Sequence, residues 1–206
     1  MFDSKGEFAI PIQGEPPKKV VVRFPTDSEF TAWRRKKKVL QRGLGRDKFQ
    51  LEASKPEACD LELVTRLFVD KESAPTLDEF EANHVLNRLT ECEVPESPDR
   101  EGSAFVLNMK VMRKLRTTHK LRVPSVKEQM EYERMRSSVI FGKHNQQEIK
   151  VNFQASGELY DKLKVEATGY ANDIPICHKA EAINVLLQSL AVQDEEAPDE
   201  DDEDQD

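Results

Sequence analysis

Val20-Val21-Val22-Arg23-Phe24-Pro25-Thr26-Asp27-Ser28-Glu29 is a strand-like run that passes through Arg and Pro into a helix start, and it decides the fold because it occurs twice. Its altered copy is Leu121-Arg122-Val123-Pro124-Ser125-Val126-Lys127-Glu128. In both copies Thr or Ser is followed three residues later by Glu, which is the pattern of a capping box. About one helix length then leads to a glycine, Gly43 or Gly142, which can end a helix.

Further matches in the same order indicate that the chain holds two copies of one unit. Residues of the first junction recur 99 positions later, and Glu81-Ala82 recurs 100 positions later as Glu181-Ala182. Ala53-Ser54 matches Ala155-Ser156 at a displacement of 102. Insertions in loops produce such small changes of offset. Capped helices resemble one another in unrelated proteins, but these matches keep their order and include identities outside the caps, so we favour duplication.

The patterning predicts an α+β, mainly helical fold made of two tandem copies of a strand-strand-helix-helix-helix unit. In the first unit, residues 1–94, two strands precede helices over about 26–42, 54–68 and 76–94. A linker rich in proline and charge covers residues 95–103. The second unit, residues 104–193, repeats the order, with helices ending near Gly142, Thr168 and Val192 and a strand-like piece over 149–153. Two copies are too few for a solenoid, so we expect two similar lobes or a pseudo-two-fold pair.

Charge separates an acidic C-terminal tail from a nearly neutral body. Residues 194–206 hold ten acidic and no basic residues, so the remainder has 31 basic and 39 − 10 = 29 acidic residues, although the whole chain has a net charge of −8. Such a tail cannot bury apolar surface and is predicted to be disordered. No apolar run approaches the roughly 20 residues of a membrane span, and three scattered cysteines indicate no disulfide framework. We therefore expect a cytoplasmic protein.

Catalytic and metal-binding patterns do not stand out in the sequence. The four histidines have no spacing suited to a metal site, and the motifs of nucleophilic hydrolases, P-loops and dinucleotide-binding folds are missing. We expect no metal, no cofactor and no enzymatic activity.

Two basic segments are the candidates for binding polyanions or the acidic tail. Residues 33–48 hold eight basic residues and one acidic residue, and residues 105–122 hold six basic and no acidic residues. The candidate residues are Arg34, Arg35, Lys36, Lys37, Lys38, Arg113, Lys114 and Arg116. One hypothesis is that the protein binds nucleic acid through these segments and that its acidic tail folds back on the basic helix after Thr26 and screens it from other polyanions. Five consecutive cations spread around a helix, so we favour a solvated face or an acidic partner over nucleic acid.

Residues 20–40, an apolar strand, Arg-Phe-Pro-Thr-Asp and then a basic helix, resemble the N-terminal part of tail assembly chaperones and related tail components of tailed phages. The duplication and the acidic tail depart from that pattern. The resemblance implies a non-enzymatic helper that binds another phage protein during virion assembly, in the host cytoplasm if the chain is phage-encoded. Candidate partner contacts are Phe30, Trp33, Met130 and Tyr132, each with core packing as the alternative. The sequence sets no oligomeric state.

Overall fold

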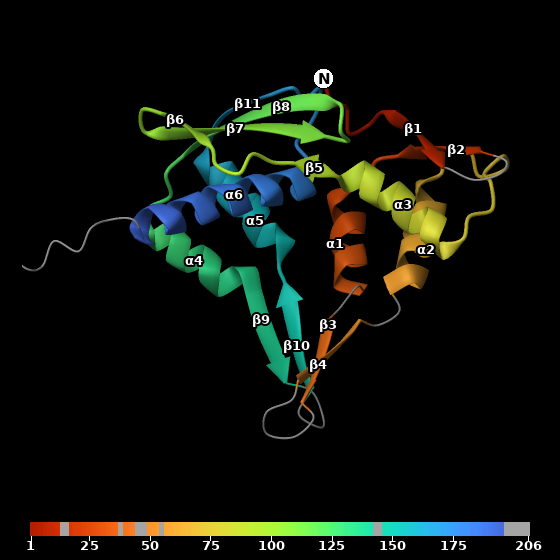
Figure 1. Ribbon diagram of the computed structural model, residues 1–206, viewed down its shortest axis with the longest axis horizontal. Helices are drawn as coiled ribbons and strands as arrows, with labels where there is room; N and C mark the ends of the chain where they lie inside the picture. The colour runs from red at the N-terminus through yellow and green to blue at the C-terminus, as the bar shows by residue number, and fades with distance from the viewer. Residues whose placement is uncertain (13–16, 37–38, 44–48, 54–55, 142–145, 196–206) are drawn as a thin grey trace, which may run out of the picture.

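The two halves of the chain share the order strand, strand, helix, strand, strand, helix, helix, and the second half has one further strand, β11, before its last helix (Figure 1). The computed structural model describes residues 1–12, 17–36, 39–43, 49–53, 56–141 and 146–195. The first half contains β1 (Glu7–Ile12), β2 (Lys18–Arg23), α1 (Asp27–Lys36), β3 (Val39–Gly43), β4 (Phe49–Ala53), α2 (Pro56–Leu67) and α3 (Glu79–Thr90). The short strands β5 (Cys92–Glu93) and β6 (Asp99–Glu101) follow. The second half contains β7 (Ala104–Val111), β8 (Leu115–Arg122), α4 (Val126–Arg136), β9 (Ser137–Phe141), β10 (Gln146–Val151), α5 (Phe153–Leu163), β11 (Lys164–Thr168) and α6 (Ile176–Glu195).

The predicted mainly helical unit of two strands and three helices is wrong. In each half a second hairpin, β3–β4 or β9–β10, lies between the first and second helices. α1 ends at Lys36 instead of near Arg42, α4 ends at Arg136 instead of near Gly142, and β11 occupies the segment where a helix was expected to run to Thr168. These segments become strands because each finds a partner strand, which overrides local helix preference. Of the predicted disordered tail, Asp194 and Glu195 belong to α6, and residues 196–206 lie outside the described residues.

Antiparallel pairing organises all the sheets. β1 and β2 form a hairpin, and β7 and β8 form the centre of a sheet in the order β11-β8-β7-β5, with β6 also paired to β7. The hairpins that follow α1 and α4 meet in a separate sheet with the order β4-β3-β10-β9. The helices of the two halves lie side by side under the first two sheets, and the last sheet projects from the body (Figure 1).

The two strand-to-helix junctions have the same atomic construction, which confirms the predicted capping boxes at Thr26 and Ser125. Arg23 donates two hydrogen bonds to Glu29, at 2.7 and 2.6 Å, and Glu29 also accepts from the backbone N–H of Thr26 at 3.0 Å. The bonds from the Arg23 guanidinium, with those from Thr26, lower the pKa of Glu29 to about 2. In the second junction Arg122 donates to Glu128 at 2.9 and 2.6 Å, and Ser125 N–H donates at 2.9 Å.

The cores of the two halves are joined. One cluster of buried side chains centres on β1, β2 and the first three helices, and it also includes Val111, Ile176 and Cys177 from the second half. At the same boundary the Phe2 ring packs against His178 with 5.0 Å between ring centroids, and Phe30 packs against Phe153 at 5.5 Å. The halves therefore share a continuous apolar boundary, whose burial drives their association.

Candidate interaction surfaces

The hairpins that follow α1 and α4 form a projecting structure that we call the arm, consisting of β3, β4, β9 and β10 (Figure 1). Its central pairing joins the two halves, because Leu40, Gln41 and Arg42 of β3 lie opposite Glu148, Gln147 and Gln146 of β10. Each hairpin contributes one central strand and one edge strand. A projecting sheet with free edges offers rows of backbone N–H and C=O groups for pairing with another chain.

The arm repeats by translation and has no two-fold axis. β3 and β9 follow the first helix of their halves, and β4 and β10 precede the second helix, so equivalent strands alternate in the order β4-β3-β10-β9. A two-fold axis would pair equivalent strands with each other, β3 with β9 or β4 with β10. The sheet instead ends in two different strands, β4 and β9, and among the strands that the structure describes each of them has one neighbour only.

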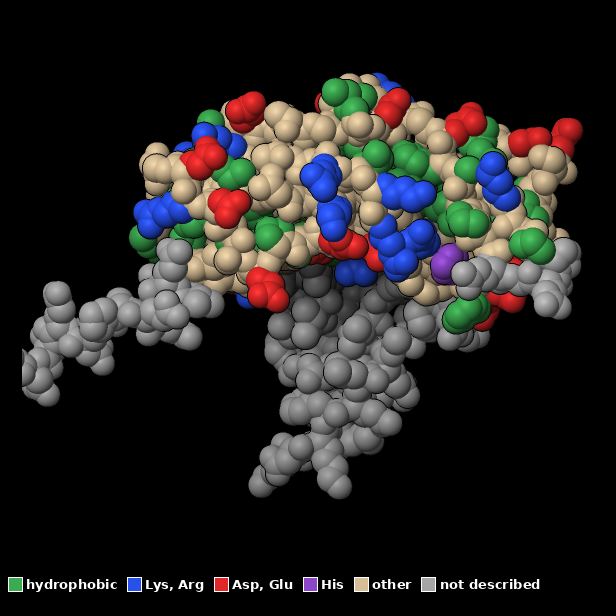
Figure 2. All heavy atoms as spheres, turned by 45° about the horizontal axis from the view of Figure 1, so that its top comes forward, with side chains coloured by type: hydrophobic (Ala, Val, Ile, Leu, Met, Phe, Trp, Pro, Cys, Tyr) green, Lys and Arg blue, Asp and Glu red, His purple; other side chains and the backbone are tan. Residues whose placement is uncertain are grey.

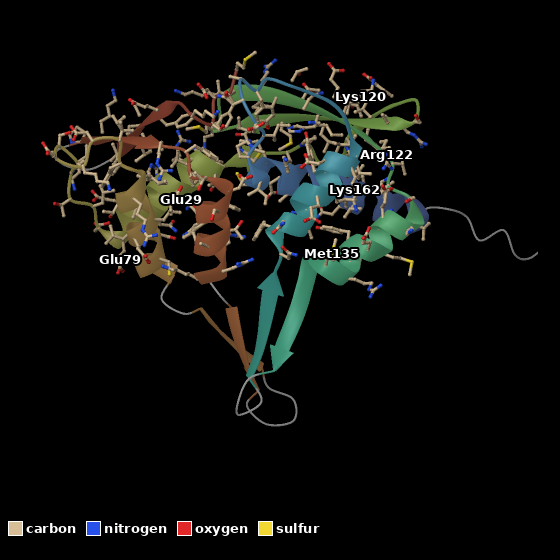
Figure 3. All side chains as sticks on the ribbon, turned by 180° about the vertical axis from the view of Figure 1, so that it is seen from behind. Glu29, Glu79, Lys120, Arg122, Met135 and Lys162 are labelled. Carbon is tan, nitrogen blue, oxygen red and sulfur yellow. The ribbon has the colours of Figure 1, made fainter. Side chains whose placement is uncertain are left out.

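Two exposed apolar sites lie toward opposite ends of the body. Phe80, in the first turn of α3, is 83% exposed. On α4, Val126 is 73% and Met130 63% exposed, one helical turn apart, and we call this pair the α4 patch. Figure 3 labels Glu79, the neighbour of Phe80, at the end of the body opposite to Met135, which is also on α4. Exposed side chains of this size are typical of contact surfaces when they cluster.

Of the four predicted partner contacts, the structure places three in the core and one on the surface. Phe30, Trp33 and Tyr132 are 6%, 6% and 4% exposed, whereas Met130 belongs to the α4 patch. Trp33 donates its indole N–H to the buried Asp60 at 2.6 Å, and Tyr132 is hydrogen-bonded to the buried Ser156 at 3.2 Å. Core packing, the alternative considered for each residue, therefore holds for the three aromatic side chains.

The aromatic-to-polar bonds also correct the alignment of the two halves. Trp33 and Tyr132 are 99 positions apart, and their partners Asp60 and Ser156 are 156 − 60 = 96 positions apart. The displacement of 102 inferred from Ala53-Ser54 and Ala155-Ser156 is therefore wrong. Small residues in that pair matched by chance, whereas the buried positions of α2 and α5 align at 96.

The basic candidates do not form one surface. Arg34, Arg35 and Lys36 lie in the last turn of α1, next to the arm, whereas Arg113 and Lys114 lie in the β7–β8 turn and Arg116 in β8. Lys37 and Lys38 lie outside the described residues. Positive and negative side chains are interspersed over the face shown in Figure 2. The electrostatic footprint that binds nucleic acid is a contiguous basic patch, and the described candidates are divided between two elements.

Intramolecular contacts also occupy several of these cations. Arg34 places its guanidinium carbon 5.3 Å from the centroid of the Phe153 ring. Lys36 pairs with Glu62 at 2.6 Å, along a groove between α1 and α2, and Arg113 pairs with Glu91 at 2.7 Å. Arg35, Lys114 and Arg116 are exposed.

A chain of buried polar rings lies where the halves meet. His119 is hydrogen-bonded to Tyr160 at 2.6 Å and to Tyr170 at 3.1 Å, and Tyr170 also contacts Nδ1 of His178 at 3.2 Å. Both histidines are fully buried, and burial lowers the pKa of His119 to about 4 and that of His178 to about 3. Nε2 of His178 has no hydrogen-bond partner among the described residues. These hydrogen bonds all lie within the second half, and His178 reaches the first half through its ring contacts with Phe2 and Phe24. Both imidazoles are shielded from solvent.

Of the arm, the sequence predicts only the strand-like piece over 149–153, part of which lies in β10, and β3, β4 and β9 are not predicted. Phe80 is expected on the apolar side of its helix, and the structure exposes it instead. Val139, Ile140 and Phe141 are the signal in the sequence for β9, although they fall in the segment where a helix is predicted. Within the described residues, no group of His, Cys, Asp and Glu side chains is arranged to hold a metal ion, and no helix is long and apolar enough to cross a membrane. Comparison of the chain with protein-family models, with curated proteins and with solved structures gave no match.

Proposed function

We propose that this chain is a non-enzymatic assembly protein that joins other protein subunits through its arm. The observation that carries the proposal is the arm itself, a sheet that projects from the body and ends in two strands, each of which has a single neighbour among the described strands. Strand addition at such an edge uses main-chain hydrogen bonds for affinity and adjacent side chains for specificity. The resemblance of residues 20–40 to tail assembly chaperones points to a phage tail as the structure being assembled, within the host cytoplasm.

A matched pair of proline variants tests whether the arm binds protein. In an edge strand, successive N–H groups point alternately to the paired neighbour and outward, and proline is tolerated only where the N–H points outward. Of Val139→Pro and Ile140→Pro in β9, one variant therefore preserves the β9–β10 hairpin and removes an outward donor. We expect both variants to lose binding, and one of them to keep the circular dichroism spectrum and thermal unfolding of the natural chain.

The measurement is co-purification with the products of neighbouring genes, expressed together with a tagged full-length chain. Partner binding that persists undiminished in both proline variants would contradict the proposal. Retention of DNA or RNA that falls steeply with salt, without any protein partner, would favour the nucleic-acid hypothesis instead.

A further inference from the structure

The contact between the two halves inside the chain supplies a template for contacts between chains. α1 of the first half lies beside α6 of the second, because Asp27 Oδ1 accepts a hydrogen bond at 2.9 Å from the N–H of Ile176, the first residue of α6. Further along both helices, burial raises the pKa of Glu181 and the charge of Arg34 opposes that rise. The two helices therefore meet at their N-terminal ends and diverge from there (Figure 1).

The equivalent positions at the free ends of the molecule are occupied by exposed apolar residues. Buried residues of α3 and α6 correspond at a displacement of 100, as Ala82 with Ala182 and Leu86 with Leu186, so Ala180 corresponds to Phe80. The junctions of α1 and α4 correspond at a displacement of 99. The list of equivalents is then Asp27 with Val126, Thr31 with Met130, and Ala180 with Phe80.

The second observation is the size of the side chains at these equivalent positions. Inside the chain Asp27 makes the hydrogen bond to α6, and Thr31 and Ala180, in the first turns of the same two helices, are small. At the free ends the same positions carry Val126, Met130 and Phe80, which are 73%, 63% and 83% exposed. Large side chains at the equivalents of contact positions are expected where a second α-helix covers them.

We propose that copies of this chain assemble head to tail, with α4 of one copy packing beside α3 of the next copy as α1 packs beside α6 within the chain. This inference rests on the proposed assembly function and names a second copy as the partner. The contact is heterologous, since the α4 patch meets Phe80 and leaves one of each unpaired at the ends of the assembly. Repetition gives a closed ring when the rotation between copies closes and a filament when it does not.

The strand pairing within the arm also predicts which residues of β9 in one copy would pair with which residues of β4 in the next copy. The displacement of 99 maps Leu40–Arg42 of β3 onto Val139–Phe141 of β9, and the registers within the hairpins map Gln146–Glu148 of β10 onto Phe49–Leu51 of β4. The pairing of Arg42 with Gln146 thus becomes a pairing of Phe141 with Phe49 of the next copy. β9 of each copy would continue the sheet into β4 of the next, and both edges of the arm become paired.

The first test is the size of the full-length protein in solution, measured by light scattering and sedimentation velocity over a range of concentrations. We expect species larger than a dimer for the natural chain, and a dissociation constant raised by about tenfold or more in Phe80→Asp and in Met130→Asp. Val165→Asp, an equally apolar-to-charged change at a 58% exposed site on β11, is the control and should assemble normally. A natural chain that stays monomeric at every concentration would overturn the proposal.

Cross-linking distinguishes a head-to-tail contact from a symmetric one. Asp27 and Ile176, which are in contact within the chain, correspond to Val126 and Thr76 at the free ends. With Thr76→Cys and Val126→Cys in one chain, mild oxidation should give a ladder of disulfide-linked multimers, whereas either change alone should give no more linked product than the natural chain. The native Cys59, Cys92 and Cys177 are half-buried or buried, and the natural chain serves as the oxidation control. Efficient linked dimers from a single variant would overturn the head-to-tail arrangement.

The two proposals can fail separately. If the chain is monomeric but binds another protein through the arm, the second-copy inference is wrong and the proposed function stands. If the proline variants of β9 still bind their partners, the proposed function of the arm is wrong, whatever the oligomeric state.

Discussion

Acidification should unfold this protein through His119, which is buried in the second half, and His178, which is buried against Phe2 and Phe24 of the first half. The pKa of each histidine is near 6.5 in the unfolded chain and falls to about 4 for His119 and about 3 for His178 in the folded chain. The unfolded state therefore binds more protons below pH 6.5. The stability that neutral histidines contribute is fully present above about pH 6.5 and is lost as the pH falls toward the folded values.

The magnitude follows from the difference between folded and unfolded pKa. Between about pH 7.5 and about pH 5, each histidine should lower the free energy of unfolding by about 2 kcal/mol, and both together by about 4 kcal/mol. The result changes little with the folded pKa, provided that it stays below 5. Glu181 acts in the opposite direction, because burial raises its pKa and its protonation stabilises the fold as the pH falls. Glu29, with a pKa of about 2 in the folded chain, contributes only below this window.

The assay is urea unfolding at a series of pH values, with the slope of stability against pH as the readout. His178→Phe removes one titrating group and keeps a ring against Phe2 and Phe24, which surround His178. We expect the slope between about pH 5 and 6 to fall by about 1.4 kcal/mol per pH unit in this variant. His119→Gln, which keeps a polar group near Tyr160 and Tyr170, should give the same decrease. An unchanged slope in both variants would refute the assignment of the acid sensitivity to these histidines.

Four further substitutions test the local structure, each by urea unfolding at neutral pH. Glu29→Gln and Glu128→Gln should each cost about 1–2 kcal/mol, because each removes an arginine pair and part of a helix cap, and matching losses would show that the two junctions are equivalent. Trp33→Phe should cost about 1–3 kcal/mol, since it deprives the buried Asp60 of the indole donor at 2.6 Å; a neutral effect would contradict that bond. Gly169→Ala should cost more than about 2 kcal/mol, because φ is +89° and the new Cβ would lie 2.5 Å from a backbone oxygen of β8; full stability would show that the turn relaxes.

The sequence predicted those parts of the fold that depend on residues close together in the chain. The Arg-Pro-Thr and Arg-Pro-Ser junctions cap their helices as expected, because the capping groups lie within three residues of each other in sequence. The helix expected to begin at about Thr76 begins at Glu79 instead, and its cap is Asp78, whose side chain accepts from the N–H of Glu81 at 2.7 Å. Thr, Asp and Glu close together offer two overlapping patterns, and tertiary packing selects one of them.

The missed elements depend on partners that are distant in the sequence. β3 pairs with β10 of the other half, and such pairing leaves no periodic signal over five residues rich in helix-forming side chains. The candidate partner contacts Trp33 and Tyr132 are buried for a related reason. Aromatic residues on an incompletely apolar helix look available, but Trp33 and Tyr132 reach buried polar partners on the next helix. Phe80 was expected on the apolar side of its helix because an exposed ring and a buried ring give the same pattern in sequence, and its exposure becomes informative through its equivalence with Ala180.

The contacts of Phe2 have a consequence for synthesis of the chain on the ribosome. Its N–H donates to the carbonyl oxygen of Gly169, and its own carbonyl oxygen accepts from Ala171, so Phe2 is held by residues that are synthesised well over a hundred residues after it. At about 5–20 residues per second, Phe2 waits roughly 10–30 s for these partners. During that interval the first core lacks its lid, and chaperones or proteases have their best access to it. Slow translation should therefore lower the yield of this protein more than that of one whose first half folds alone.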